Sequence, residues 1–300
     1  MRYDITIPSH GETLAAWVYP GSTKPGPCII LAHGLGAVRE MRLDAFAERF
    51  QQEGYTCLVF DYRCSGSSSG KPRGLVDFAR QQEDWDAVLD HVKSPSMADV
   101  IDPTKLAIFG TSFGGGHVIQ VAARHPELKA VISQCPFTSG LSSSFTTGVW
   151  PLPKLLWLSL RDALFGTDDA PVRVPLVGKP GDAALMNAPD VEPGYKALIP
   201  PGLTFLEEIP ARFILKLPLL RPGSYASSVS SPILFAICGR DSVAPPGPSL
   251  SYAKSAKKGV VKHYDDMGHF DIYTGKDFDR ATKDYVAFLA ENLPVPKAKL

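Results

Sequence analysis

The sequence lacks the features that mark membrane-spanning, secreted and nucleic-acid-binding proteins. No apolar run approaches the ~18 residues that a membrane-spanning helix needs. Residues 1–19 include Asp4, His10 and Glu12 and contain no apolar core of a signal peptide, so we expect an intracellular protein. Lysine plus arginine and aspartate plus glutamate number 31 each, and this balance favours neither nucleic acid nor a membrane surface as a partner.

Cysteine is scarce, and its spacing is irregular. An odd number of cysteines argues against a disulfide framework and predicts five free thiols: Cys28, Cys57, Cys64, Cys135 and Cys238. No second ligand stands at metal-binding spacing from His33, so the sequence predicts neither a metal nor another cofactor. We therefore expect a reduced, cytoplasmic protein.

Short apolar runs alternate with segments whose apolar residues recur at helical spacing. The runs predict strands at 5–7, 14–19, 28–32, 56–60, 106–109, 130–133, 233–237 and 260–263. The periodic segments predict helices at 40–52, 75–92, 115–124 and 277–292. This alternation is typical of an α/β fold with a doubly wound, mostly parallel sheet that helices cover on both faces.

The segment 137–231 interrupts this alternation. Sixteen of the 27 prolines fall between Pro151 and Pro248, and proline prevents long ladders and helices. We expect short helices and ordered loops there, inserted into a core formed by residues 1–136 and 232–300. An insertion of this length is usually a lid or a binding element, and an ordinary structural insertion is the alternative.

Ser112 is the candidate nucleophile. It is the centre of Gly110-Thr111-Ser112-Phe113-Gly114, between a predicted strand and a predicted helix. In that context the turn is sharp, tolerates only small neighbours and exposes the serine hydroxyl. Because a serine hydroxyl is a poor nucleophile at neutral pH, it also needs a base and an oxyanion site.

His269 is the candidate base. The chain order expected after such a nucleophile is an acid and then a histidine. His269 lies in the loop between the last predicted strand and the last predicted helix, whereas most of the other six histidines precede the sheet or lie in or at the ends of predicted elements. His117 lies too soon after Ser112 on the same helix to fold back onto it.

Asp241 is the candidate acid. It follows the predicted strand 233–237, and its role would be to hold the imidazole tautomer and stabilise the imidazolium. Three aspartates closer to His269 in sequence are rivals: Asp265, Asp266 and Asp271. Neighbours in sequence usually cannot reach the far ring nitrogen of a histidine, which favours Asp241.

The oxyanion donors are expected after the predicted strand 28–32. That loop is His33-Gly34-Leu35-Gly36, and the backbone N–H groups of Leu35 and Phe113 form the predicted pair. We interpret His33 as a side chain that supports this loop rather than as a metal ligand.

The sequence resembles the α/β-hydrolase superfamily over nearly its whole length. The motifs that carry the resemblance, in the order of that family, are His33-Gly34-Leu35-Gly36, Asp61-Tyr62-Arg63 with Gly66 and Ser68, Gly110-Thr111-Ser112-Phe113-Gly114, Gly239-Arg240-Asp241 and Gly268-His269-Phe270. The core resembles the dienelactone-hydrolase and Xaa-Pro-peptidase-like branch. Segments 110–117, 134–138 and 178–188 are similar to hydrolases of fungal polyketide pathways, including the fumagillin-type polyketide transferase group. Cys64 departs from the pattern, because many relatives have glycine or a bulky residue there.

The resemblance implies a triad of Ser112, Asp241 and His269 and an acyl-enzyme formed from an ester or a thioester. The spacing of the residues leads independently to the same triad. The leading hypothesis is a hydrolase for a hydrophobic acyl group, for which a polyketide-derived chain is one candidate. An acyltransferase that passes the acyl group to an alcohol is the alternative, and a non-catalytic binding module on the same scaffold is a third reading.

Three further residues are candidates for the substrate pocket. Cys135 follows a predicted strand at the carboxyl edge of the sheet, where ligands bind in open α/β folds, and it could instead pack as a small apolar residue. Trp150 and Trp157 belong to an apolar stretch at 150–165, which favours a bulky hydrophobic acyl group.

The last residues, Ala298-Lys299-Leu300, resemble a peroxisomal address of the Ser-Lys-Leu type. If the source is a fungus, they predict recognition by the import receptor and a peroxisomal location, and a solvated tail is the alternative. Whatever the source, we also expect a small-molecule acyl substrate as a partner. The sequence does not decide between a monomer and a homodimer.

Overall fold

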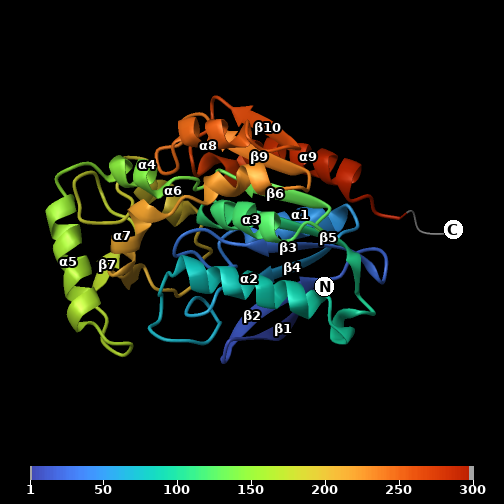
Figure 1. Ribbon diagram of the computed structural model, residues 1–300, viewed down its shortest axis with the longest axis horizontal. Helices are drawn as coiled ribbons and strands as arrows, with labels where there is room; N and C mark the ends of the chain where they lie inside the picture. The colour runs from blue at the N-terminus through green and yellow to red at the C-terminus, as the bar shows by residue number, and fades with distance from the viewer. Residues whose placement is uncertain (1, 297–300) are drawn as a thin grey trace.

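The structure is a computed structural model that describes residues 2–296. Within these residues the main sheet has eight strands, in the order β1-β2-β4-β3-β5-β6-β9-β10 (Figure 1). Their bounds are β1 Tyr3–Ser9, β2 Glu12–Tyr19, β3 Gly26–Ala32, β4 Thr56–Phe60, β5 Ile101–Thr111, β6 Ala130–Gln134, β9 Ile233–Cys238 and β10 Gly259–Tyr264. β1–β2 and β2–β4 are antiparallel and the other neighbours are parallel, which confirms the predicted mostly parallel sheet.

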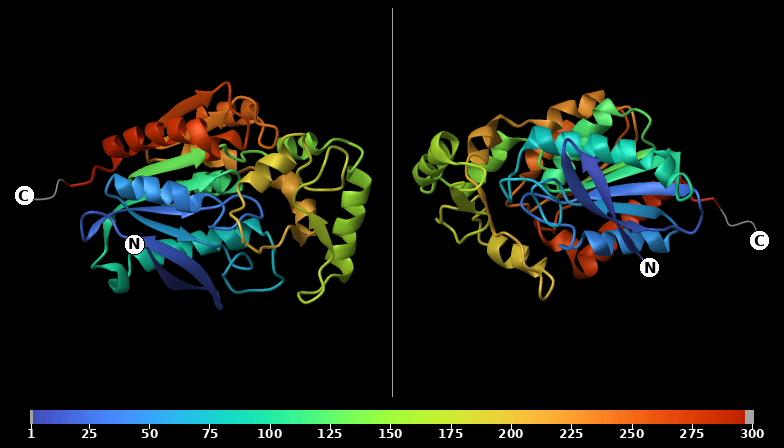
Figure 2. Two further views of the ribbon diagram at one scale, coloured as in Figure 1. Left: turned by 180° about the vertical axis from the view of Figure 1, so that it is seen from behind. Right: turned by 90° about the horizontal axis from the view of Figure 1, so that it is seen from below.

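Helices cover both faces of this sheet (Figures 1 and 2). Their bounds are α1 Leu43–Gln52, α2 Phe78–Val92, α3 Phe113–Arg124, α8 Pro246–Ala253 and α9 Gly275–Asn292. Along β3, Ile29 and Leu31 pack in the core under α1 and α9, whereas Cys28 and Ile30 pack in the core under α2 and α3. Because successive side chains of a strand point to opposite faces, a strand buried on both sides is apolar throughout.

Two helices begin later than their apolar periodicity predicts, and each has a local cause. Before α1, Arg42 has a φ of 72°, a left-handed conformation that cannot belong to the helix. Before α2, the Asp77 side chain accepts hydrogen bonds from the N–H groups of Ala79 and Arg80 and so caps the helix. Apolar spacing alone does not report these boundaries.

Between β6 and β9 the chain folds into short elements at one end of the sheet (Figure 1). Their bounds are α4 Gly140–Ser144, α5 Leu152–Phe165, β7 Arg173–Pro175, α6 Val191–Ala197, β8 Glu208–Pro210 and α7 Phe213–Lys216. β7 and β8 form a small antiparallel sheet, and the helical turn Pro222–Ser228 packs against α3 and α8. The division into a core of residues 1–136 and 232–300 and a lid of residues 137–231 stays a prediction.

The sequence led to two expectations about location, one on membrane-spanning helices and one on a peroxisomal address. No helix within residues 2–296 combines the length and the apolar character needed to cross a membrane. The predicted peroxisomal address at residues 298–300 lies outside the described residues.

Candidate active site

Ser112 occupies the turn between β5 and α3. Its φ of 57° and ψ of −117° are rare for a residue with a side chain and mark a sharp, strained turn. A Cβ atom on Gly110 would collide with the carbonyl oxygen of Gly114, and one on Gly114 would lie 2.5 Å from the carbonyl oxygen of His33. The two glycines are therefore required by close packing around the turn, as the motif predicts.

His269 lies in the loop after β10, and its ring bridges two side chains. Nε2 lies 3.0 Å from Ser112 Oγ, and Nδ1 lies 2.7 Å from Asp241 Oδ2. His269 and Asp241 are both buried. A neutral ring that donates its Nδ1–H to the carboxylate keeps the Nε2 lone pair for the serine hydroxyl.

Asp241 lies in the loop after β9 and is held by the backbone that follows it. Its Oδ1 accepts hydrogen bonds from the N–H groups of Val243 at 2.9 Å and Ala244 at 2.6 Å, which leaves Oδ2 for His269. The rival carboxylates face other partners. Asp265 pairs with His263, Asp266 with Arg280, and Asp271 accepts from the N–H of Gly268.

The predicted oxyanion residues flank Ser112. Leu35, Phe113 and Ser112 all line one cavity. Gly34 brings the loop against the serine, because a Cβ atom there would lie 2.9 Å from Ser112 Cβ. Phe113 is the first residue of α3, so its N–H has no acceptor inside the helix and lies at the positive end of the helix dipole. This placement suits a pair of oxyanion donors.

His33 is buried behind this loop. Its Nδ1 lies 3.0 Å from the carbonyl oxygen of Gly34, and its ring meets Tyr62 edge to face. Within residues 2–296 its Nε2 has no hydrogen-bond partner and lies 3.6 Å from Asp61 Oδ1. Burial lowers the pKa of His33 to about 4 and raises the pKa of Asp61 to about 7. His33 is therefore a neutral side chain that supports the loop.

Cys135 is buried behind the serine and histidine, not in a cavity beside them. Its Sγ lies 3.6 Å from both Thr111 Oγ1 and Tyr273 OH. Burial raises the pKa of its thiol to about 12, so it carries no thiolate near neutral pH. The ligand atoms of Cys135, Asp241 and His269 lie within 4.8 Å of one another, a spacing that a metal ion could bridge. The hydrogen bond between Asp241 and His269 already uses two of these ligand atoms.

Two small cavities adjoin Ser112, with volumes of about 30 and 40 Å³. Ser112, Leu35 and Met186 line both. The 30 Å³ cavity, on the side of His269, is also lined by His33, Gly34, Ala37, Met41, Thr111, Leu198, His269, Phe270 and Tyr273. The 40 Å³ cavity is also lined by Phe113, Phe137, Ser143, Thr146, Leu185, Leu217, Val243 and Ala244. Most of these residues were not expected, because an apolar side chain in a loop carries no sequence signal for the cavity that it lines.

The structure does not bring Trp150 and Trp157 to Ser112. They are 89% and 57% exposed, and neither lines the two cavities beside the serine. Both belong to the stretch around α5, which lies at the end of the molecule far from the sheet (Figures 1 and 2). The side of α5 that is buried instead carries Asp162, whose carboxylate pairs with Arg212 at 2.7 Å.

The sheet, the strained serine turn and the buried histidine–aspartate pair together define a protein of the α/β-hydrolase class. The family described as serine aminopeptidase S33 matches residues 23–165. The quorum-quenching protein AidA of Acinetobacter baumannii is 46% identical over 97% of this chain and 95% of its own length. The α/β hydrolase GrgF from Penicillium sp. sh18 shares the fold with a TM-score of 0.83, at 24% identity over 98% of this chain and 99% of that one. The chain belongs to the α/β-hydrolase family and is an enzyme of that family.

Fungal relatives also align over most of the chain. The thiohydrolase aneE of Aspergillus aculeatus is 28% identical over 94% of this chain and 91% of its own length. The polyketide transferase af380 of Aspergillus fumigatus is 25% identical over 97% of this chain and 99% of its own length. These relatives confirm the predicted resemblance to fungal polyketide-pathway hydrolases.

Proposed function

We propose that this protein is a serine hydrolase that cleaves an ester or a thioester of a hydrophobic acyl group through an acyl-enzyme at Ser112. The observation that carries the proposal is the chain of hydrogen bonds from Ser112 Oγ through His269 to Asp241, at 3.0 and 2.7 Å. A nucleophile, a base and a residue that orients the base stand in hydrogen-bonding reach of one another, as acyl transfer requires.

The geometry supports a two-step reaction. His269 Nε2 takes the proton of Ser112 as Oγ attacks the carbonyl carbon, and Asp241 stabilises the imidazolium that results. The N–H groups of Leu35 and Phe113 stabilise the negative charge on the substrate oxygen. The imidazolium then protonates the departing oxygen or sulfur, and water releases the acyl group by the reverse sequence.

The cavity walls and the relatives support the class of substrate. The 40 Å³ cavity beside Ser112 is lined mostly by apolar side chains, which suit a hydrophobic acyl group. The thiohydrolase relative favours a thioester. The quorum-quenching relative is more similar to this chain than the thiohydrolase is, and it favours a quorum-sensing signal as a second class of substrate to test.

Acyl transfer to an alcohol is the second candidate, because one relative is a polyketide transferase. The same three residues would form the same acyl-enzyme, and only the acceptor would differ. Product analysis with water and an alcohol in competition separates the two. A non-catalytic binding module is the third candidate, and the complete set of hydrogen-bonded residues argues against it.

The test is covalent labelling together with turnover. A fluorophosphonate probe should modify Ser112, and p-nitrophenyl or acyl-thioester substrates should be hydrolysed. Ser112→Ala should abolish labelling and lower kcat by about 10⁴-fold or more. Ser96→Ala, at an exposed serine, is the matched control. The proposal fails if folded wild-type protein is not labelled, or if Ser112→Ala retains hydrolysis.

A further inference from the structure

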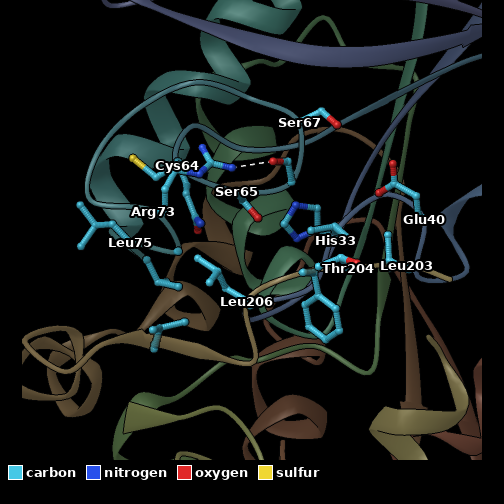
Figure 3. A pocket seen from close by; sticks show the side chains of 18 residues that line it. His33, Glu40, Cys64, Ser65, Ser67, Arg73, Leu75, Leu203, Thr204 and Leu206 are labelled. Atoms are coloured by element: carbon cyan, nitrogen blue, oxygen red, sulfur yellow. Dashed lines mark hydrogen bonds between the residues drawn. The ribbon is translucent and has the colours of Figure 1, made fainter. Parts of the chain in front are cut away.

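A larger cavity, of about 310 Å³, lies beside the serine site without including Ser112 (Figure 3). Three parts of the chain form most of its lining: the loop after β3, the segment between β4 and α2, and the stretch of the insertion before β8. Gln81 of α2 and Ile209 of β8 complete it. The three parts contribute His33, Arg73 and Thr204 respectively, which Figure 3 shows around the cavity. A volume of this size suits a small organic group.

The large cavity is adjacent to the 30 Å³ cavity at Ser112. His33 is the residue that lines both of them. The loop that follows forms the wall between them, because Gly36 and Val38 line the large cavity whereas Leu35 and Ala37 line the small one. The large cavity is therefore the space next to the Ser112 site on the side of His33.

The position of His269 indicates whether the acyl group or the leaving group of the substrate lies toward the large cavity. In the proposed reaction His269 delivers the serine proton to the departing oxygen or sulfur, so the leaving group must lie on the side of His269. His269 lines the 30 Å³ cavity that adjoins His33, and it does not line the 40 Å³ cavity beside Phe113 and Val243. The acyl group therefore belongs to the 40 Å³ cavity, and the leaving group points toward the large one.

Polar side chains of the large cavity suit a polar leaving group. Ser65, Ser67, Gln81 and Thr204 line it with hydroxyl and amide groups. The Gln81 amide oxygen already faces His117 Nε2 at 2.8 Å, which leaves its N–H₂ group for a ligand. By contrast, the 40 Å³ cavity on the acyl side is mostly apolar. Apart from Ser112, only Ser143 and Thr146 of its lining residues carry hydroxyl groups.

Two oppositely charged side chains line the large cavity, Glu40 and Arg73. Glu40 pairs with Arg39 at 3.3 Å. The Arg73 guanidinium donates to the backbone carbonyl oxygens of Ser68 and Gly66. A guanidinium has five N–H donors, so Arg73 keeps further donors free after these two hydrogen bonds. The carbonyl oxygens carry no formal charge and do not neutralise the guanidinium.

We propose that the large cavity binds the leaving group of the substrate, and that this leaving group is a polar thiol or alcohol with an anionic group placed near Arg73. The inference rests on the proposed function. The acyl carbon–sulfur or carbon–oxygen bond breaks as the Ser112 Oγ–carbon bond forms. The proton moves from Ser112 through His269 to the leaving group, so no other reactant is needed.

The test compares three thioesters with the same medium-chain acyl group. Their thiols are 3-mercaptopropionate, N-acetylcysteamine and thiocholine, which are anionic, neutral and cationic. Wild-type kcat/KM should be highest for the anionic thiol and exceed that of the cationic thiol by about 10-fold, the effect of a partly exposed charge. Arg73→Gln should reduce this ratio to about 2-fold or less, and Arg73→Lys should restore most of it.

The control variant removes a different cation from the same loop. Lys71 is exposed, pairs with Asp169 and does not line the cavity, so Lys71→Gln should leave the ratio unchanged. A purely structural role of Arg73 would lower kcat/KM equally for all three thioesters. A second variant, Thr204→Trp, should fill the cavity and slow all three thioesters while sparing the methyl thioester of the same acid.

Two results would overturn the inference. One is a charge preference that survives Arg73→Gln, and the other is unchanged turnover of the bulky thioesters in Thr204→Trp. Either result leaves Ser112 labelling and turnover intact. Absence of labelling at Ser112 would instead reject the proposed function itself, so the two failures are distinguishable.

Discussion

At the scale of single residues, the two oxygens of Asp241 have different partners. Oδ1 accepts two backbone N–H groups, from Val243 and Ala244, and Oδ2 accepts from His269 Nδ1. The backbone thus fixes which oxygen faces the imidazole. A carboxylate suits both sides of this arrangement, because both of its oxygens accept hydrogen bonds.

Asp241→Asn should therefore reverse the tautomer of His269. The amide oxygen must take the place of Oδ1 to accept the two backbone N–H groups, so the amide nitrogen faces Nδ1. Nδ1 must then accept, and the proton moves to Nε2, which can no longer accept from Ser112. We expect kcat to fall by about 10³–10⁴-fold with little change in KM. Kinetics with an ester substrate and ¹⁵N chemical shifts of His269 check both parts.

Asp271→Asn provides the matched control for that prediction. Asp271 is close to His269 in sequence, and its carboxylate accepts from the N–H of Gly268 rather than from the imidazole. We expect its kcat to stay within several-fold of the wild type. A loss as large as that of Asp241→Asn would mean that Asp271 orients His269 during the reaction.

At the scale of elements, His117 joins α3 to α2 in the interior. Its Nε2 lies 2.8 Å from Gln81 Oε1, and its Nδ1 lies 2.6 Å from Gln82 Nε2. Burial is the first cause that lowers the pKa of His117 well below its usual value, and the nearby His33 and Arg124 add to it. The contact between these helices therefore depends on a neutral imidazole.

This arrangement predicts a loss of stability in acid. Below about pH 6.5 the unfolded chain protonates His117 and the folded chain does not, so the unfolded state binds more protons. The free energy of unfolding should fall by about 2 kcal/mol between about pH 7.5 and pH 5 because of this residue. Urea unfolding at the two pH values measures the change, and His117→Gln should show a drop smaller by that amount. His263→Gln, at an exposed histidine, should keep the wild-type drop.

The elements themselves were largely predictable from the sequence, because their physics is local. β3, β4 and β9 are buried on both faces, and only continuous apolar runs satisfy that burial. Helix starts were less predictable. They depend on single backbone conformations, such as that of Arg42, which apolar periodicity does not record.

In the candidate site, the catalytic residues were predictable from the sequence, whereas the pocket residues were not. Ser112, Asp241 and His269 follow parallel strands, whose carboxyl ends share one edge of the sheet, so chain order brings them together. Pocket residues depend on how the insertion folds. The tryptophans of the α5 region look like pocket residues in sequence, yet the Asp162–Arg212 pair is on the buried side of that helix.

At the scale of the whole molecule, residues from the segment 137–231 line both cavities at Ser112. The cavities at Ser112 measure about 30 and 40 Å³, which is far below the volume of a bulky acyl substrate. Met186 lines both of them, and its backbone N–H donates to the carbonyl oxygen of Leu176 within the insertion. Met186 therefore lies between the acyl side and the leaving-group side of the site.

Shortening Met186 should open the site to larger acyl groups. We expect Met186→Ala to react about 10-fold faster than wild type with a long-chain alkyl fluorophosphonate, because several methylenes gain room, while a methyl analogue reacts at an unchanged rate. The lost burial should cost roughly 2–5 kcal/mol of stability, so rates are compared well below the melting temperature. Leu155→Ala removes a buried side chain of α5 that lines neither cavity, and it should lower stability without changing the ratio of the two rates. Equal acceleration of both probes, or the same ratio change in Leu155→Ala, would show that general loosening of the insertion, rather than Met186, limits access to Ser112.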